Sequence, residues 1–324
     1  MIQILRLALL GGALAAPPVQ RSGRSSVRPP RHQLALPHSR RGDVAGTPGV
    51  ANTTELWFAN RIDHLTSDIP PGGNYTYAQR FFVNGDHWTS GGPIFFYCGN
   101  EADVTLYVNS TGLMWERAAD FGALLVWGEH RYYGQSQPLG SLEASAADKR
   151  FLSVEQALAD FAALVSHIKH ELLESPDSAV VGFGGSYGGM LASWMRFKYP
   201  HIIDGAIAAS APIWSFEGES PLCDPNFYAE GVTYDVSTAG GAASPWCEDN
   251  FRAAFASERL AYAGATPEGR AALEEGFKLC APLEGDASGW DVTYWVNTAL
   301  SYMAMGNYPY PSSYILNGDG TVYA

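Results

Sequence analysis

Short apolar runs alternate with helix-like segments through the first two thirds of the chain. Strands are predicted at Arg80–Val83, Pro93–Cys98, Ala123–Trp127, Ala179–Phe183 and Gly205–Ala209. Between them, Met114–Phe121 and Met190–Tyr199 have the spacing of helices, and Pro200 ends the second. Because strands alternate with helices, we expect an α/β fold with a parallel sheet covered on both faces.

The strongest helix signal begins after Ser153. Ser153 and Gln156 have the spacing of a capping box, and apolar residues then recur every three to four positions. The predicted core face holds Val154, Leu158, Phe161, Val165, Ile168 and Leu172. This periodicity predicts a long helix that packs on the sheet.

The pattern changes after Trp214, where aromatic, Gly-rich and Ala-rich segments replace the strand-like runs. Helices are predicted at Phe251–Tyr262, Pro267–Leu279 and Val292–Met305. We interpret this region as a helical insertion that covers the sheet, with its boundary near residue 215.

The N-terminus has the pattern of a secretory signal peptide over residues 1–16. Arg6 precedes the apolar stretch Leu7–Leu14, and small residues follow up to Ala16. Residues 17–52 are rich in Arg and Pro and predict a disordered linker or pro-segment. No later stretch approaches the ~18 uninterrupted apolar residues of a membrane span.

The charge is distributed unevenly along the 324 residues. Residues 1–50 hold seven Arg and one acidic residue, which leaves 13 basic against 32 acidic residues in the rest of the chain. Such a surface argues against nucleic acid or an anionic membrane as the partner, and it suits an acidic compartment.

The cysteines and glycosylation motifs agree with secretion. Asn52, Asn74 and Asn109 each begin an Asn-X-Ser/Thr sequon. In an oxidising compartment, the four cysteines should mostly be paired, although Cys98 ends an apolar run and a buried free thiol is the alternative for it. No Cys/His spacing indicates a metal site, and we expect no cofactor.

The most informative stretch is "VVGFGGSYGGMLASWMRFKYP", residues 180–200. Gly184, Ser186 and Gly188 fit the G-x-S-x-G nucleophile elbow between a predicted strand and a predicted helix. The elbow strains the serine backbone, and the glycines two residues away avoid clashes, while Gly185 and Gly189 should let the helix pack tightly on the strand. A phosphate-binding loop is disfavoured, because no Lys follows these glycines.

An elbow serine needs donors for the oxyanion that forms when it attacks a carbonyl group. The N–H of Tyr187, at the start of the predicted helix, is one candidate. The second donor in such folds comes from the loop after an earlier strand. Here that loop is residues 99–101, and we favour Asn100.

Several longer segments resemble the serine peptidase family of lysosomal Pro-X carboxypeptidase and dipeptidyl peptidase II. They include "GGPIFFYCGNEAD" (91–103), "GEHRYYGQSQPLG" (128–140), "LSVEQALADFAALVSHIK" (152–169), "GFGGSYGGMLASWMRFKYPHIIDGAIAASAPIWSFEG" (182–218), "FKLCAPL" (277–283) and "AMGNYPYPSSY" (304–314). The resemblance runs from about Trp57 to about Tyr314, with "APIWSFEG" closer to the carboxypeptidase branch.

The resemblance implies an α/β-hydrolase fold with an inserted helical cap. Residues 53–215 would be the N-terminal part of the catalytic domain and residues 216–324 an incomplete cap. It further implies a serine exopeptidase, with Ser186 as nucleophile, that cleaves proline-containing peptides either after Pro at the C-terminus or after an N-terminal dipeptide. No metal or organic cofactor is implied, and we leave a homodimer open.

Two other polar residues follow predicted strands. His130 precedes Ser186, whereas α/β-hydrolases place the His after the nucleophile, so we interpret His130 as structural. Glu101 is a candidate for binding a substrate amino group, with an ion pair to Arg131 as the alternative.

Other functions stay open at this point. An esterase or lipase has the same elbow, and a non-catalytic α/β-hydrolase relative would keep the fold without the reaction.

The catalytic Asp and His are not evident in the sequence. His201 is the one His after Ser186, and it follows the elbow helix, so we expect it at the opposite end of the sheet. We therefore expect both residues beyond Ala324, with the C-terminal part of the fold missing and this 324-residue chain inactive by itself.

Secretory entry is testable by expression in a secretory host. Because of the leader and the sequons, we expect a glycosylated product whose apparent mass falls on treatment with an N-glycosidase. A cytosolic product of unchanged mass would contradict this prediction.

Overall fold

The computed structural model describes residues 48–66, 75–139, 148–216, 218, 224, 227–235, 237, 244–256, 264, 266–283 and 289–305. The chain forms two compact units, Met1–Phe216 (unit 1) and Glu217–Ala324 (unit 2). The predicted signal peptide 1–16, most of segment 17–52 and the sequon residue Asn74 lie outside the described residues.

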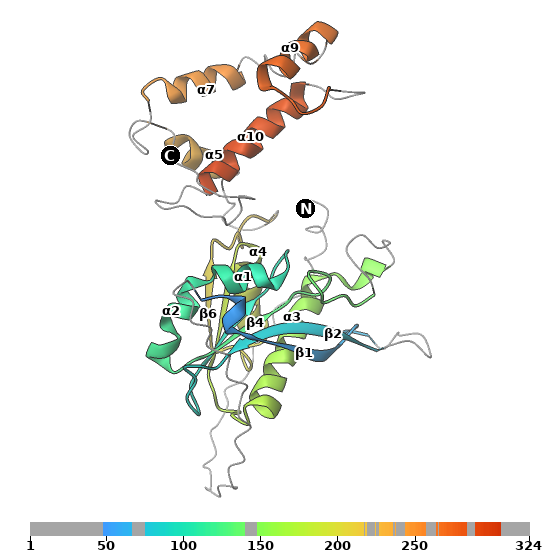
Figure 1. Ribbon diagram of the computed structural model, residues 1–324, viewed down its shortest axis with the longest axis vertical. Coiled ribbons are helices and arrows are strands. Elements are labelled where there is room, and N and C mark those ends of the chain that lie inside the picture. The colour runs from blue at the N-terminus through green and yellow to red at the C-terminus, as the bar shows by residue number, and fades with distance from the viewer. Residues whose placement is uncertain are drawn as a thin grey trace, which may run out of the picture. The chain divides into compact units, whose positions relative to one another are not determined.

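Unit 1 contains a six-stranded mixed sheet in the order β1-β2-β4-β3-β5-β6 (Figure 1). The strands are β1 (Thr54–Arg61), β2 (Thr76–Asn84), β3 (Ile94–Cys98), β4 (Leu124–Gly128), β5 (Val180–Gly185) and β6 (Gly205–Ala209). β4, β3, β5 and β6 are parallel, whereas β2 is antiparallel to both β1 and β4. The five predicted strands are confirmed. The sheet was predicted to be parallel, and β2 departs from this prediction because it is antiparallel to its neighbours. β1 was not predicted.

Helices cover both faces of this sheet. They are α1 (Val104–Ser110), α2 (Gly112–Phe121), α3 (Val154–His167) and α4 (Tyr187–Lys198), with short helical turns η2 (Val50–Asn52), η3 (Asp148–Phe151) and the π-helical η4 (Ile168–Leu172). Ile94 and Phe96 of β3 pack with α3 and α4, whereas Phe95 and Tyr97 pack with α1 and α2. This period of two along a strand that is buried on both faces places one apolar cluster on each side of the sheet.

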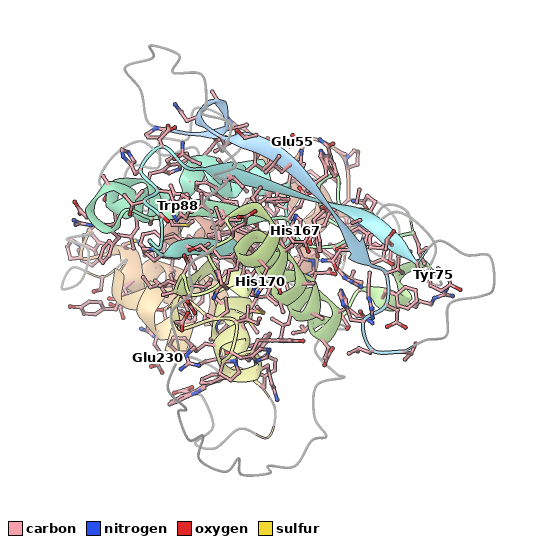
Figure 2. All side chains as sticks on the ribbon, turned by 90° about the horizontal axis from the view of Figure 1, so that it is seen from below. Glu55, Tyr75, Trp88, His167, His170 and Glu230 are labelled. Carbon is pink, nitrogen blue, oxygen red and sulfur yellow. The ribbon has the colours of Figure 1, made fainter. Side chains whose placement is uncertain are left out.

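Helix α3 begins where its sequence signal predicts. The Oγ of Ser153 accepts a hydrogen bond from the backbone N of Gln156 at 3.4 Å. The Gln156 side chain does not complete the capping box, because its Nε2 donates to Asp63 and its Oε1 accepts from the backbone N of His64. The predicted core face of α3 is confirmed. Figure 2 labels His167 at the end of this helix, where its ring stacks on Phe58 of β1.

A buried ion pair joins α3 to the loop after β4. The guanidinium group of Arg131 donates to both carboxylate oxygens of Asp160 at 2.6 and 2.7 Å. Asp160 also accepts from Tyr77 Oη at 2.6 Å, and its Oδ1 lies 2.8 Å from His64 Nε2. Arg131 donates further to the backbone oxygens of residues 61, 62 and 151. Both charged groups are therefore fully satisfied in the core.

At the other edge of the sheet, β6 pairs on one side with β5, and no described strand pairs with its second side. The side chain of Ile207 in β6 is 43% exposed, and Ala208 and Ala209 are also exposed. Within the described part of the chain, β6 is thus an edge strand with an apolar surface.

Unit 2 is helical in its described parts. Its helices are α5 (Phe227–Asp235), α7 (Cys247–Ala256), α9 (Pro267–Phe277) and α10 (Gly289–Met305). The three predicted helices are present, with residues 257–262 of the first outside the described range, and α5 was not predicted. Among the apolar side chains described in this unit, only Leu273 and Val292 are buried.

The cysteines differ from the expectation. Cys98, Cys247 and Cys280 are free thiols, and Cys223 lies outside the described residues. Cys98 is completely buried at the end of β3, where burial raises the pKa of its thiol. The alternative of a buried free thiol is thus confirmed for Cys98.

None of the described helices is both long enough and apolar enough to cross a membrane.

The Asp160→Asn variant should be strongly destabilised. It keeps the shape of the side chain but leaves Arg131 buried without an anionic partner, which costs about 3–5 kcal/mol. Urea unfolding measures the loss. The matched control is Glu171→Ala, which removes the exposed pair between His167 and Glu171 and should cost less than about 1 kcal/mol. Equal unfolding midpoints for the two variants would contradict the prediction.

Candidate active site

Ser186 lies on a sharp turn between β5 and α4. Its φ of 55° and ψ of −124° are a rare backbone conformation for a residue other than glycine. The backbone N of Ser186 donates to the backbone O of Ala209 at 3.0 Å, which ties the turn to the end of β6. The side chain is exposed, and no described residue forms a hydrogen bond with its hydroxyl. This is the strand–turn–helix geometry of a nucleophile elbow.

Three of the four glycines around Ser186 leave no room for a side chain. A Cβ on Gly184 would lie 2.0 Å from the backbone O of Gly188, and one on Gly188 would lie 2.8 Å from the backbone O of Cys98. A Cβ on Gly189 would lie 2.7 Å from the backbone O of Ala209. The packing role expected for Gly185 was wrong, because the nearest atom to its Cβ would be 4.0 Å away.

The loop after β3 contacts the elbow, as the sequence predicts for an oxyanion loop. Asn100 is 5% exposed. Its Nδ2 donates to Oε2 of Glu101 at 3.0 Å and lies 3.4 Å from the backbone O of Gly185. Its Oδ1 would lie 2.9 Å from a Cβ on Gly188. The loop and the elbow are therefore packed directly against one another.

Glu101 does not pair with Arg131, because Arg131 is bound to Asp160. That alternative of the sequence analysis is therefore wrong. The Glu101 side chain is exposed, and it is close enough to Tyr133 and Tyr187 to raise the pKa of both hydroxyl groups, after the larger effect of burial. A solvent-accessible carboxylate thus lies beside the elbow.

His130 contacts the elbow through a neighbour of Ser186. Its Nδ1 lies 2.7 Å from the backbone O of Arg131, and its Nε2 lies 3.1 Å from Oη of Tyr187. The ring is 1% exposed, and burial lowers the pKa of His130 to about 4. Sequence reasoning identified His130 as structural but did not find its bond to Tyr187, because the two residues are 57 positions apart.

His201 lies away from Ser186. The backbone N of Asp204 donates to the backbone O of Val180, and its Oδ2 accepts from the backbone N of Val180. Residues 201–204 therefore lie at the start of β5, whereas Ser186 follows its end. His201 is at the opposite end of the sheet, as expected, and its ring lies beside Tyr199.

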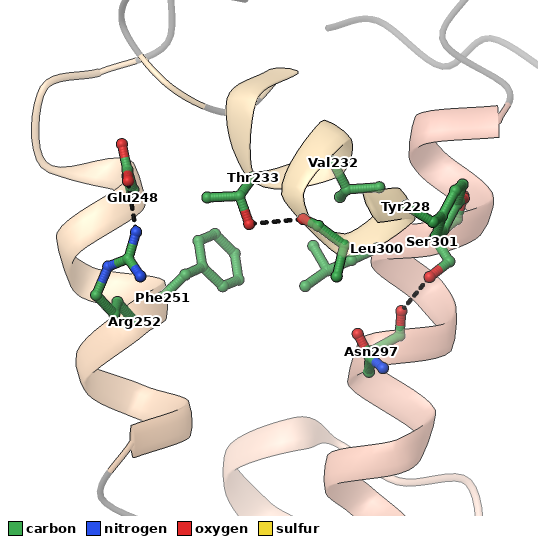
Figure 3. Close-up of a pocket in the computed structure, with 10 residues that line it drawn as sticks. Tyr228, Val232, Thr233, Glu248, Phe251, Arg252, Asn297, Leu300 and Ser301 are labelled. Atoms are coloured by element: carbon green, nitrogen blue, oxygen red, sulfur yellow. Dashed lines mark hydrogen bonds and ion pairs between the residues drawn. The ribbon is translucent and has the colours of Figure 1, made fainter. Parts of the chain in front are cut away.

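A separate cavity of about 250 Å³ lies within unit 2, between α5, α7 and α10 (Figure 3). Tyr228, Phe251 and Leu300 contribute apolar surface, and Glu248 pairs with Arg252 at 2.6 Å on one side. None of the predicted site residues lines this cavity. Within the described part of the chain, no cluster of three or more His, Cys, Asp or Glu could hold a metal ion.

Two of the three predicted glycosylation sites lie close together. Asn109, at the end of α1, is exposed, and its Oδ1 accepts from the backbone N of Val50 at 3.0 Å. Asn52 lies in the same short turn as Val50 and is partly exposed. Both amide groups are near the surface of unit 1.

The strand order, the helices on both faces and the elbow define an α/β-hydrolase fold. The family Serine carboxypeptidase S28 matches residues 61–321. The chain belongs to this serine peptidase family.

Curated relatives extend this comparison. The chain is 36% identical to lysosomal Pro-X carboxypeptidase of Mus musculus over 322 residues, which cover 96% of the chain and 59% of the relative. It is 40% identical to the Homo sapiens protein of the same name, covering 83% of the chain and 52% of the relative. Prolyl carboxy peptidase like protein 5 of Caenorhabditis elegans is 40% identical over 73% of the chain and 46% of the relative. The chain thus spans about half the length of the relatives it matches.

The elbow glycines provide a matched test. Gly184→Ala places a Cβ against the backbone of Gly188, so we expect it to destabilise the fold by about 1–3 kcal/mol. Gly185→Ala adds the same atom one residue later, where its nearest neighbour would be 4.0 Å away, and should change the free energy of unfolding by less than about 0.5 kcal/mol. Urea unfolding of the two variants measures the difference. A Gly185 variant as unstable as the Gly184 variant would refute this account of the turn.

Proposed function

We propose that the chain carries the nucleophile of a serine exopeptidase that hydrolyses peptide bonds next to proline, with Pro-X carboxypeptidase-like specificity. The observation that carries the proposal is the conformation of Ser186, which has a positive φ and an exposed side chain. Gly184 and Gly188, two residues away on either side, cannot hold a Cβ. Family membership and the names of the curated relatives support the reaction and the substrate class. No cofactor is proposed.

The reaction would proceed through an acyl-enzyme. The Oγ of Ser186 attacks the carbonyl carbon of proline in the Pro-X bond, and the carbonyl oxygen becomes an oxyanion. The N–H of Tyr187 lies at the N-terminus of α4 and has no partner within the helix, so it is the first donor to this oxygen. The N–H of Asn100 is the second, since the Asn100 loop packs against the elbow. The oxyanion then collapses, the bond from carbon to nitrogen breaks, and the C-terminal residue leaves as an amine that takes the proton removed from Ser186. Water hydrolyses the remaining ester and releases the peptide that ends in proline together with the Ser186 hydroxyl.

A general base is needed to take the proton from Ser186. His130 is bound to Arg131 and Tyr187, and His201 lies at the far end of the sheet. Neither of these two residues, and none of the other described His residues, forms a hydrogen bond with Ser186. We therefore propose that the catalytic His and its Asp partner come from outside the described residues.

The position of Glu101 supports a second candidate function, that of an aminodipeptidase similar to dipeptidyl peptidase II. Its exposed carboxylate beside the elbow would attract a positively charged group, such as the free amino terminus of a peptide. A C-terminal carboxylate placed at the same point would be repelled. The charge of the substrate therefore distinguishes the two specificities.

We further propose that the protein enters the secretory pathway and acts in a lysosome or vacuole or outside the cell. The relatives named as lysosomal, the acidic composition and the exposed sequon residue Asn109 support this location. Asn52 and Asn109 are the glycosylation sites proposed among the described residues.

The Ser186→Ala variant tests the function. The protein should be expressed from the longest natural transcript that contains this sequence and assayed with an N-terminally blocked peptide ending in Pro-Phe. We expect the wild type to release Phe and the variant to lose ~10⁴-fold or more of the rate, because nucleophile and base act as a unit. A fluorophosphonate probe should label the wild type and not the variant.

The matched control is Ser193→Ala, which removes a hydroxyl from the same helix that only donates to the backbone O of Met190. Retained activity in Ser186→Ala would refute the nucleophile assignment. If the enzyme releases Lys-Ala or Xaa-Pro dipeptides and leaves the blocked peptide intact, its specificity is that of an aminodipeptidase and not that of a carboxypeptidase.

A further inference from the structure

The elbow contains one side chain that can anchor it. Residues 184–189 read Gly-Gly-Ser-Tyr-Gly-Gly, so only Ser186 and Tyr187 carry side chains. The Ser186 hydroxyl must stay free to attack a substrate. Asn100 contacts the turn from outside, through the backbone O of Gly185. Among the turn's own side chains, only that of Tyr187 is therefore available to fix its orientation.

The Tyr187 ring is anchored by His130. Its Oη lies 3.1 Å from Nε2 of His130, and the two ring centroids are 5.5 Å apart. The His130 ring is held in turn by its Nδ1, 2.7 Å from the backbone O of Arg131, and by edge contacts with Tyr133 and Phe161. The anchor thus rests on a ring that is itself fixed on several sides.

The direction of each hydrogen bond follows from its acceptor. A carbonyl oxygen only accepts, so Nδ1 of His130 carries the proton and donates to Arg131. Burial lowers the pKa of His130 to about 4, so at neutral pH its Nε2 has no proton and accepts. Burial raises the pKa of the Tyr187 hydroxyl, which therefore keeps its proton and donates it to Nε2.

We propose that His130 is a positioning residue. Through the hydroxyl of Tyr187, it holds the backbone N–H of Tyr187 in the orientation that stabilises the oxyanion formed when Ser186 attacks. The proposal rests on the proposed function of Ser186. It requires no contact between His130 and the substrate.

The expected effect is on the chemical step. Loss of an oxyanion donor costs about 10²–10³-fold in kcat, and a misplacement of about 1 Å costs up to about 10²-fold. A donor that is misaligned rather than removed should therefore lower kcat by about 10–100-fold. Substrate binding uses other groups, so KM should change by less than about twofold.

Three single variants and one double variant test the proposal in the protein from the longest natural transcript that contains this sequence. In His130→Asn, the amide N can still donate to Arg131, but the acceptor for Tyr187 is lost. In His130→Gln, the longer side chain brings an amide oxygen close to the position of Nε2. Tyr187→Phe removes only the hydroxyl, and it keeps the test available if His130→Asn does not fold.

We expect His130→Asn and Tyr187→Phe each to lower kcat on the blocked Pro-Phe peptide by about 10–100-fold with KM nearly unchanged. The double variant His130→Asn/Tyr187→Phe should be no slower than the slower single variant, because both changes break the same bond. His130→Gln should recover most of the rate. The rate of fluorophosphonate labelling should follow kcat through the series.

The matched control is Tyr199→Phe. Tyr199 follows the other end of α4, beside His201, and no described residue forms a hydrogen bond with its hydroxyl. Its kcat should stay within about twofold of the wild type.

The outcomes separate this proposal from the function on which it rests. Normal kcat in His130→Asn and Tyr187→Phe, with Ser186→Ala inactive, would overturn the positioning role and leave the nucleophile in place. A lower melting temperature with unchanged kcat, or additive losses in the double variant, would likewise overturn it. Activity in Ser186→Ala would overturn the proposed function itself.

Discussion

Three consecutive buried polar residues after β4 determine how the elements of unit 1 pack. Each of them needs a hydrogen-bond or ion-pair partner, and each finds it in a different part of the chain. Glu129 accepts from Arg80 of β2, His130 binds Tyr187 at the start of α4, and Arg131 binds Asp160 of α3. All three are at most 1% exposed. A buried charge or polar group without a partner is costly, so these bonds constrain β2, α3 and the elbow together. The loop after β4 thus determines where the candidate nucleophile lies.

The elbow itself is strained, and the surrounding bonds explain why it persists. For a residue other than glycine, such a backbone conformation costs about 1–3 kcal/mol. It persists only where several contacts of the surrounding structure hold it in place. Ser186 is held on one side by its backbone bond to Ala209 and on the other by α4, which begins at the next residue. The oxyanion loop packs against Gly188, and His130 holds Tyr187. Apart from α4 itself, each of these contacts comes from a different strand of the sheet or from the loop that follows that strand.

Local signals in the sequence predicted much of this arrangement, and long-range pairing was the part that could not be predicted. β3, β5, β6 and the elbow were found because apolar runs and glycines are contiguous. β1 was missed because it alternates polar and apolar residues and contacts the core on one face only. The alternative that Glu101 pairs with Arg131 was wrong, because the partner of Arg131 is Asp160, which lies 29 positions away on a helix face that otherwise looks apolar. The packing role expected for Gly185 was wrong for another reason. A run of glycines does not show which of them lie too close to other backbone atoms to carry a Cβ.

The depth at which His130 is buried has two opposite consequences in an acidic compartment. An exposed His would gain a proton below pH about 6.5 and could no longer accept a hydrogen bond at Nε2. With its pKa lowered to about 4 by burial, His130 stays neutral at about pH 5, so the bond from Tyr187 persists there. The unfolded chain does bind a proton at this position below pH about 6.5. The free energy of unfolding therefore falls as the pH drops from about 6.5 through about 4. Acid thus weakens the fold as a whole before it breaks the one bond that anchors the elbow.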